Sequence, residues 1–212
     1  MKVLITGANG FIGQALQQLL LEHGVDVVAG IRRNSCKNLS WQHLDLKDIA
    51  NGTTDTLDLS GIDIIVHAAA LVHQMNTISP ECYKNLNVKG TVNLAKAAAK
   101  AGVKRFVFLS SIKVNGENTN QRSPFTADEV VQSPEDPYAR SKYEAEQSLL
   151  ELGRETGLEV VIIRPPLVYG KGVKANFKVM LGMVRKRIPL PFGAIHNRRS
   201  MVHIDNLCSL IF

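Results

Sequence analysis

Short apolar runs alternate with longer segments of helical periodicity along most of this chain. Apolar residues recur at helical spacing after Gly10, over Pro80–Ala101 and over Tyr138–Thr156. Strands that are apolar throughout and alternate with helices are typical of a parallel sheet with helices on both faces. We therefore predict an α/β fold with a doubly wound parallel sheet. The predicted strands are Val3–Ile5, Val25–Ala29, Trp41–Leu44, Ile62–Val66, Arg105–Leu109 and Glu159–Ile163.

The pattern changes at two places along the chain. Residues 116–137 contain few apolar residues and three prolines, which predicts a surface loop. The composition shifts again at Gly170, so we predict a domain over residues 1–170 and the start of a smaller C-terminal region over 171–212. The sequence stops inside an amphipathic stretch, Asn206–Phe212. We therefore expect the C-terminal region to be incomplete and the chain to be truncated.

The composition is that of an ordinary globular protein. The chain has 212 residues, 45% of them hydrophobic and 21% charged, which is enough for one sizeable core. No apolar run approaches the ~18–20 residues that cross a bilayer, so we expect no membrane segment. The three cysteines, Cys36, Cys82 and Cys208, are scattered and indicate neither a disulfide framework nor a metal site. These features favour a cytoplasmic location.

The net charge of +6 is unevenly distributed. Residues 160–204 contain nine Lys and Arg but no Asp or Glu, which leaves 16 positive and 19 negative groups elsewhere. A basic segment on a mildly acidic domain indicates an anionic ligand, with a solvated basic face as the alternative. No basic motif interleaved with aromatic residues is present, so we expect no nucleic-acid partner.

Three glycines, Gly7, Gly10 and Gly13, lie between the first predicted strand and the first predicted helix. In this position glycines let the backbone approach a pyrophosphate, and the helix N-terminus offers free N–H groups and partial positive charge. Glycines also mark plain turns, and the spacing here is G-x-x-G-x-x-G. The placement between strand and helix nevertheless predicts a Rossmann-type dinucleotide site.

Candidate catalytic side chains lie at a strand end and on a helix. Tyr138 and Lys142 are four residues apart and share one helical face, where an ammonium group can favour the phenolate form of Tyr. Ser110 and Ser111 follow a predicted strand, and ligands bind at the carboxyl ends of parallel strands. Each feature alone is common, since a Y-x-x-x-K pair and a serine turn occur in many proteins.

Together these pieces resemble the extended short-chain dehydrogenase/reductase superfamily, in its nucleotide-sugar epimerase, dehydratase and reductase branch. The resemblance runs over nearly the whole chain. Its motifs are Thr6-Gly-Ala-Asn-Gly-Phe-Ile-Gly13, Asp45-Leu46, His67-Ala-Ala-Ala70, Asn87-Val-Lys-Gly-Thr91, Leu109-Ser-Ser-Ile-Lys-Val-Asn-Gly116, Tyr138-Ala-Arg-Ser-Lys142, Arg164-Pro-Pro-Leu-Val-Tyr-Gly170 and Arg199-Ser-Met-Val-His-Ile-Asp205.

The resemblance implies a role for each matched residue. Tyr138 would be the catalytic acid/base, Lys142 would bind the nicotinamide ribose and lower the Tyr138 pKa, and Ser111 would orient the reacting oxygen. Substrate would be bound by Ser111, Asn176 and Arg199. The residues expected at the cofactor are Gly7, Asn9, Gly10, Phe11, Ile12, Gly13, Asp45, Leu46, Ala68, Ala69, Ala70, Asn87, Lys142 and Pro165.

The second predicted strand ends in a way that bears on the cofactor. NAD-preferring members of this superfamily have an acidic residue there, which bonds the ribose 2′-OH. Here that position is Ile31, followed by Arg32 and Arg33. Two guanidinium groups can hold a 2′-phosphate, so we predict NADP in preference to NAD. The alternative is that both arginines are solvated loop charges.

We therefore expect an NAD(P)-dependent enzyme that transfers hydride at a sugar carbon, C4, of a UDP-sugar. An epimerase and a 4-ketoreductase both remain open. Dehydration is disfavoured, because family dehydratases have Thr and an acidic pair where this chain has Ser111, Ile112 and Lys113. Asn115 replaces the Tyr that is usual in epimerases. A catalytically inactive, cofactor-sensing regulator is the alternative from another functional class.

The resemblance also implies a homodimer. The two long predicted helices, Pro80–Ala101 and Tyr138–Thr156, would pair with their mates across a two-fold axis. The small residues Ala95, Ala97, Ala98 and Ala145 are expected to permit this close approach.

Overall fold

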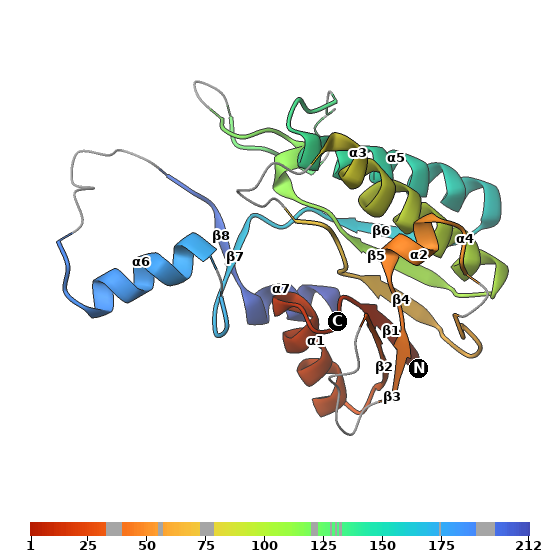
Figure 1. The fold of residues 1–212 in the computed structure, drawn as a ribbon. Helices are drawn as coiled ribbons and strands as arrows, with labels where there is room; N and C mark the ends of the chain where they lie inside the picture. The colour runs from red at the N-terminus through yellow and green to blue at the C-terminus, as the bar shows by residue number, and fades with distance from the viewer. Residues whose placement is uncertain are drawn as a thin grey trace.

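A six-stranded, all-parallel sheet forms the body of the protein (Figure 1). The strand order is β3-β2-β1-β4-β5-β6, which is the Rossmann order and confirms the predicted fold class. The structure, a computed structural model, describes residues 1–32, 40–54, 57–72, 79–119, 123–127, 129, 131, 133–173, 175–189 and 198–212. The strands are β1 (Lys2–Thr6), β2 (Asp26–Ile31), β3 (Ser40–His43), β4 (Ile64–His67), β5 (Arg105–Leu109) and β6 (Glu159–Ile163).

Helices cover both faces of the sheet (Figure 1). One face carries α2 (Leu46–Ala50), α3 (Pro80–Tyr83), the π-helix η1 (Lys84–Lys89), α4 (Gly90–Lys100) and α5 (Pro137–Thr156). The other face carries α1 (Phe11–Glu22) and α7 (Ile204–Ile211), which contact each other. Among the described residues, no helix combines the length and apolarity that a membrane span requires.

Alternation along β1 divides the core into two layers. Leu4 packs with Phe106 and Phe108 of β5 in the layer under α4 and α5. Val3 and Ile5 point the opposite way and pack in the layer formed with α1 and α7. Strands that are apolar on both faces are therefore buried on both faces, as the sequence pattern predicts.

The predicted helix over Pro80–Ala101 is helical throughout but changes hydrogen-bond pattern in its middle. The segment α3 is followed directly by the π-helix η1 and then by α4. Asn87 lies in η1 and is almost fully buried, and Gly90 begins α4 beside the backbone of Leu46. A π-segment of this kind is a frequent feature of functional sites.

The C-terminal part contains a second, two-stranded parallel sheet of β7 (Leu167–Tyr169) and β8 (Met201–His203). The helix between these strands, α6 (Ala175–Arg185), lies apart from the main sheet in Figure 1. However, α7 packs on α1, so the last residues join the helical layer of the main sheet. The domain boundary at residue 170 stays a prediction.

Three of the four small residues expected to face a partner helix lie in the core, whereas Ala97 is half-buried and its part in a dimer contact stays a prediction. Ala95, Ala98 and Ala145 are completely buried in the chain's own core, where α4 and α5 contact each other. Their small size therefore allows close packing within one protomer. The expectation that these three alanines mediate contact across a two-fold axis is wrong, and the homodimer itself stays a prediction.

Candidate active site

The glycine turn between β1 and α1 is so tight that side chains would disrupt it. Gly7 has φ +66°, and a Cβ atom there would lie 2.8 Å from the Cα atom of Ala69. A Cβ atom on Gly10 would lie 2.9 Å from the Gly7 carbonyl oxygen, and one on Gly13 would collide with that same oxygen. The three glycines thus allow the turn to fold on itself and against the loop after β4.

The N-terminus of α1 faces this turn, and its N-cap residue makes no side-chain hydrogen bond. Gly10 is the N-cap residue and carries no side chain, so the first helical N–H groups have no acceptor from a capping side chain. Such N–H groups bind phosphate well. The turn is held from beneath by Gln17, whose Nε2 donates to the carbonyl oxygens of Ala8, at 2.6 Å, and Gly13, at 3.0 Å.

Gln17 is a structural part of the site that the sequence analysis did not identify. It lies on the buried face of α1, in line with Leu16 and Leu20, and is only 7% exposed. A polar residue within an otherwise apolar helical stripe was the signal that could have revealed it, because buried amides require hydrogen-bond partners.

A buried hydrogen-bonded network connects β1, β4 and α4 beside the glycine turn. The Thr6 hydroxyl accepts a bond from the Ala69 backbone N–H at 3.1 Å and lies 2.7 Å from Nδ1 of His67. Nε2 of His67 lies 2.9 Å from the Thr91 hydroxyl. Complete burial, with the charge of Lys142 adding to it, lowers the pKa of His67 to about 3, so the ring is neutral.

Two of the residues predicted at the cofactor also have structural partners. Asp45 caps α2 by accepting the Lys47 backbone N–H at 2.9 Å. Asn87 bonds both backbone groups of Leu71, at 2.8 and 3.0 Å, and also donates to the Ser141 hydroxyl. The Asn87 amide therefore fixes the segment after Ala68–Ala70 against α5.

Three other predicted residues, Arg32, Pro165 and Arg199, lie close to the ends of strands. Arg32 is exposed directly after β2, and Arg199 is exposed just before β8. Pro165 follows β6, and its carbonyl oxygen accepts the Ile112 N–H at 3.1 Å. Arg33 and the side chain of Asn176 lie outside the described part of the chain.

The structure brings Ser111, Tyr138 and Lys142 together where β5 ends and α5 begins. Asp136 caps α5 by accepting the Ala139 N–H at 2.8 Å, which places Tyr138 in the first helical turn. The Ser111 side chain lies near enough to the Tyr138 hydroxyl to lower its pKa slightly. The ammonium nitrogen of Lys142 donates to the Leu109 carbonyl oxygen at 2.8 Å and lies 4.5 Å from the centroid of the Phe108 ring.

The structure does not show the expected lowering of the Tyr138 pKa by Lys142. Burial, assisted by the negative charge of Asp136, raises the pKa of Tyr138 to about 12, and the nearby Ser111 side chain only partly opposes this rise. Burial also lowers the pKa of Lys142 to about 7, while Glu146 acts against that shift. The Lys142 ammonium group donates to the Leu109 carbonyl oxygen, and it is burial that keeps the phenol protonated.

A buried ion pair supports α5 one helical turn beyond Lys142. Glu146 is completely buried, and its carboxylate accepts bonds from Arg164 Nε at 2.9 and 3.2 Å and from Nη2 at 2.6 Å. Arg164 directly follows β6, so the pair joins α5 to that strand end. The sequence analysis missed this pair because its residues are 18 positions apart and meet only through packing.

The residues present fit a dinucleotide. The glycine turn forms a cradle that a Cβ atom would fill, and it opens at an uncapped helix N-terminus. At the other end of the site, the Ser110 hydroxyl is buried next to Ser111 and has no hydrogen-bond partner among the described residues. A buried hydroxyl without a partner is unfavourable.

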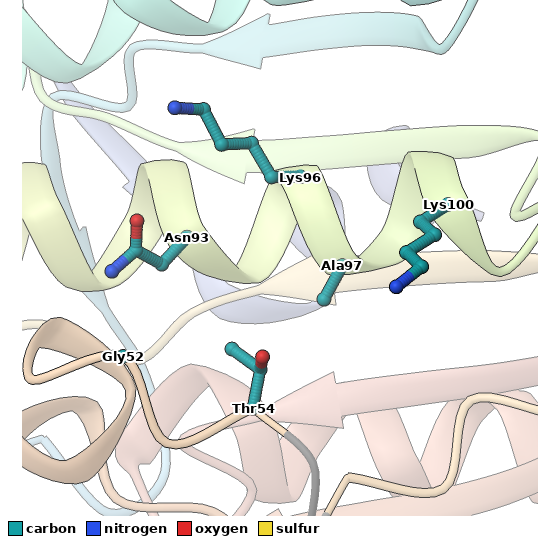
Figure 2. Close-up of a pocket in the computed structure, with 6 residues that line it drawn as sticks. All are labelled: Gly52, Thr54, Asn93, Lys96, Ala97 and Lys100. Carbon is teal, nitrogen blue, oxygen red and sulfur yellow. The ribbon is translucent and has the colours of Figure 1, made fainter.

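An open groove on the outward side of α4 is a separate feature (Figure 2). Its volume is about 270 Å³, and none of the predicted site residues that the structure describes lines it. Figure 2 shows two lysines of α4 at its edge, above a segment that follows α2. The lining residues are Gly52, Thr54, Asn93, Lys96, Ala97 and Lys100.

The Rossmann sheet, the glycine cradle and the Ser–Tyr–Lys group define an enzyme of the extended short-chain dehydrogenase/reductase class. Residues 3–212 match the NAD dependent epimerase/dehydratase family, and the chain belongs to it. The predicted family resemblance is thus confirmed.

Named relatives agree with this assignment. The chain is 44% identical, over 99% of its length, to a UDP-glucose 4-epimerase of Vibrio cholerae, and it spans 65% of that relative's length. It is similar to the UDP-glucose-bound structure of a UDP-glucose 4-epimerase from Thermotoga maritima, with 25% identity and a TM-score of 0.79, covering 99% of this chain and 71% of the other. A dTDP-glucose 4,6-dehydratase from Streptomyces venezuelae, solved with NAD, gives 28% identity and a TM-score of 0.80, covering 100% and 70%.

Proposed function

We propose that this chain carries the cofactor-binding and catalytic part of an NAD(P)-dependent enzyme that transfers hydride at C4 of a nucleotide-diphosphate sugar, specifically a UDP-sugar. The observation that carries the proposal is the placement of Ser111, Tyr138 and Lys142 where β5 ends and α5 begins, with Lys142 hydrogen-bonded to the last residue of β5. Ligands of doubly wound sheets bind at this edge. The 44% identity to a UDP-glucose 4-epimerase supports the substrate class.

The residues divide the proton chemistry between them. When bound, the nicotinamide exchanges a hydride with the sugar carbon. Tyr138 moves the matching proton: it donates to the C4 keto oxygen when the carbon is reduced and recovers that proton when the alcohol is oxidised. A Tyr138 pKa of about 12 keeps the phenol protonated at neutral pH, which suits the donating direction. Ser111 holds the same oxygen through its hydroxyl.

Lys142 acts in this proposal as a binding group for the nicotinamide ribose. Its ammonium group already lies at the end of β5 and donates to the Leu109 carbonyl. The glycine cradle and the N-terminus of α1 hold the pyrophosphate, with Asp45, Leu46 and Ala68–Ala70 along the rest of the dinucleotide. Arg199, and Asn176 in α6, are assigned to the substrate diphosphate.

We further propose NADP as the preferred cofactor, on the strength of Arg32 at the end of β2 and the lack of an acidic residue at Ile31. An epimerase and a 4-ketoreductase use the same residues. The first performs oxidation and reduction in succession on one sugar, and the second performs reduction only. The inactive regulator is disfavoured, because the structure retains Ser111, Tyr138 and Lys142 in one place.

The experiment incubates the protein with UDP-glucose, UDP-galactose and a UDP-4-keto-6-deoxy sugar, each with NAD, NADH, NADP or NADPH. Stoichiometric loss of reduced-cofactor absorbance identifies a reductase, and a new sugar isomer without net cofactor change identifies an epimerase. Tyr138→Phe is the control, and its turnover should fall by about 10²–10⁴-fold with cofactor affinity retained. A Tyr138→Phe variant with wild-type turnover would contradict the acid/base assignment.

A further inference from the structure

Asn115 links the segment that carries Ser111 to Arg164 and Glu129, and through Arg164 to the helix that carries Tyr138 and Lys142. It follows η2 (Ile112–Val114), the short 3₁₀-helix that begins directly after Ser111. Its Oδ1 atom accepts a bond from Arg164 Nη1 at 3.2 Å, and its Nδ2 atom donates to Glu129 Oε2 at 3.4 Å. Arg164 in turn binds Glu146, on the same helix as Tyr138.

The chemistry at this point requires an amide. A guanidinium group only donates hydrogen bonds and a carboxylate only accepts them. An Asn side chain offers one acceptor to Arg164 and one donor to Glu129 at the same time, whereas Asp would place a second carboxylate beside Glu129. The residue that replaces the usual epimerase Tyr is therefore matched to the charged groups on either side of it.

Hydrogen bonds join residues Ser111 to Asn115 into a single turn. The Ser111 hydroxyl accepts the Lys113 N–H at 3.3 Å, and the Ser111 carbonyl oxygen accepts the Val114 N–H at 3.0 Å. The Asn115 N–H closes the turn by donating to the Ile112 carbonyl oxygen at 2.9 Å. Displacing Asn115 would therefore displace Ser111 as well.

We propose that Asn115 is a positioning residue, whose side-chain amide, held between Arg164 and Glu129, fixes the position of the Ser111 hydroxyl at the end of β5. The catalytic part of this inference rests on the proposed function. Asn115 acts through Ser111 and touches neither the reacting carbon nor the cofactor. Asn115 bonds Arg164, and Arg164 bonds Glu146 of α5, so this ion pair links the Ser111 segment to α5.

The test uses an exchange of polarity between Asn115 and Glu129. Asn115→Asp keeps the acceptor for Arg164 but opposes two carboxylates. Adding Glu129→Gln restores the bond between positions 115 and 129, because the new amide at position 129 can donate to the new carboxylate at position 115 while that carboxylate still accepts from Arg164. Asn93→Asp is the matched control, because Asn93 also donates through Nδ2, to the Ile49 carbonyl, but lies in the groove on α4.

The first measurement is hydrogen–deuterium exchange, followed by mass spectrometry, and it requires no substrate. In Asn115→Asp we expect amide exchange over residues 112–116 to accelerate about tenfold, the equivalent of losing one hydrogen bond to a charged group. Exchange should return to within about twofold of wild type in the Asn115→Asp, Glu129→Gln variant and stay unchanged in Asn93→Asp. Unchanged exchange in Asn115→Asp, or no recovery in the double variant, would overturn the proposal.

The second measurement separates positioning from plain structure. We expect Asn115→Asp to lower kcat about tenfold while KM for the cofactor stays the same. In a Ser111→Ala background the same substitution should have little effect on kcat. The two changes are then non-additive, because Asn115 acts through Ser111. An equal loss in both backgrounds would overturn the role of Asn115 at Ser111. If wild type turns over none of the sugars tested, the proposed function fails, whereas the exchange data still decide whether Asn115 orders the Ser111 segment.

Discussion

Lys142 donates a hydrogen bond from its buried ammonium group to the carbonyl oxygen of Leu109, 2.8 Å away on the neighbouring strand. The same nitrogen lies over the Phe108 ring, whose other neighbour is the neutral ring of His67. The Phe108 ring thus contacts both the lysine of the Ser–Tyr–Lys group and the histidine of the network beside the glycine turn. Burial disfavours the charged forms of both Lys142 and His67 and lowers the pKa of each. Two predictions follow from these lowered pKa values.

The first prediction concerns stability at alkaline pH. Burial lowers the pKa of Lys142 from 10.5 to about 7, so between these values the unfolded chain binds the additional proton. The free energy of unfolding must then rise with pH across this window, by about 1.4 kcal/mol per pH unit from this group. In Lys142→Met this contribution is absent. Urea unfolding of both proteins at pH 7 and pH 9 measures it, and a constant difference between them would contradict the buried-lysine assignment.

The second prediction concerns acid. The pKa of His67 is lowered to about 3, against 6.5 when unfolded, so the unfolded chain binds more protons between these values. The free energy of unfolding should fall as the pH falls from 6.5 towards 3, at roughly 1.4 kcal/mol per unit from His67. The measurement compares wild type with His67→Gln over this range. Carboxylates contribute equally to both proteins, so equal slopes would show that His67 is not held neutral.

A third prediction tests the glycine turn. In Gly13→Ala the new methyl group would meet the Gly7 carbonyl and the Ala8 backbone, neither of which can rotate away. We expect a loss of roughly 1–3 kcal/mol in the free energy of unfolding, together with weaker NAD binding in a fluorescence titration. Gly182→Ala is the control: it lies in α6 with open space around it, and should be neutral or stabilising by about 0.5–1 kcal/mol. Wild-type NAD affinity in Gly13→Ala would contradict the cradle.

The parts of the fold that local pattern determines were predictable. The strands Arg105–Leu109 and Glu159–Ile163 agree with the structure at both ends, because continuous runs of Val, Ile and Phe have few alternatives to a buried strand. The glycine turn was predictable because its three glycines lie between an apolar strand and a helix of clear periodicity. By contrast, α2 has only five residues, and the short strands β7 and β8 carry little periodicity. Such elements form because neighbouring segments pack against them.

The site was predictable as a set of residues but not as a set of interactions. Tyr138, Ser111 and Lys142 are recognisable from spacing, yet the pKa of Tyr138 rises where the sequence indicated that it falls, because desolvation depends on packing. Glu146 and Arg164 lie on a helix and after a strand, so only the fold brings them together. Asn115 likewise acquires its role from Arg164, which is distant in sequence, whereas Gln17 bonds the nearby turn that its own helix follows.

The last prediction concerns the choice of cofactor. The second strand ends at Ile31 without an acidic residue, and Arg32 is exposed directly after it. A 2′-phosphate would meet no negative charge there, and each charge-assisted hydrogen bond it gains contributes about 1.5–3 kcal/mol. In an Arg32→Ala, Arg33→Ala variant, NADP binding should therefore weaken about tenfold or more. NAD binding should stay nearly the same, because NAD lacks that phosphate.

Titration of both cofactors into wild type and the double variant provides the measurement. Lys47→Ala, a change to an exposed cation at the start of α2, serves as a control for a general loss of positive charge, and should weaken both cofactors little. Two results would contradict the NADP prediction. One is tighter binding of NAD than of NADP by wild type. The other is an equal loss of both cofactors in the double variant, since that would mean that the arginines act on the shared pyrophosphate or on the fold, and not on the 2′-phosphate.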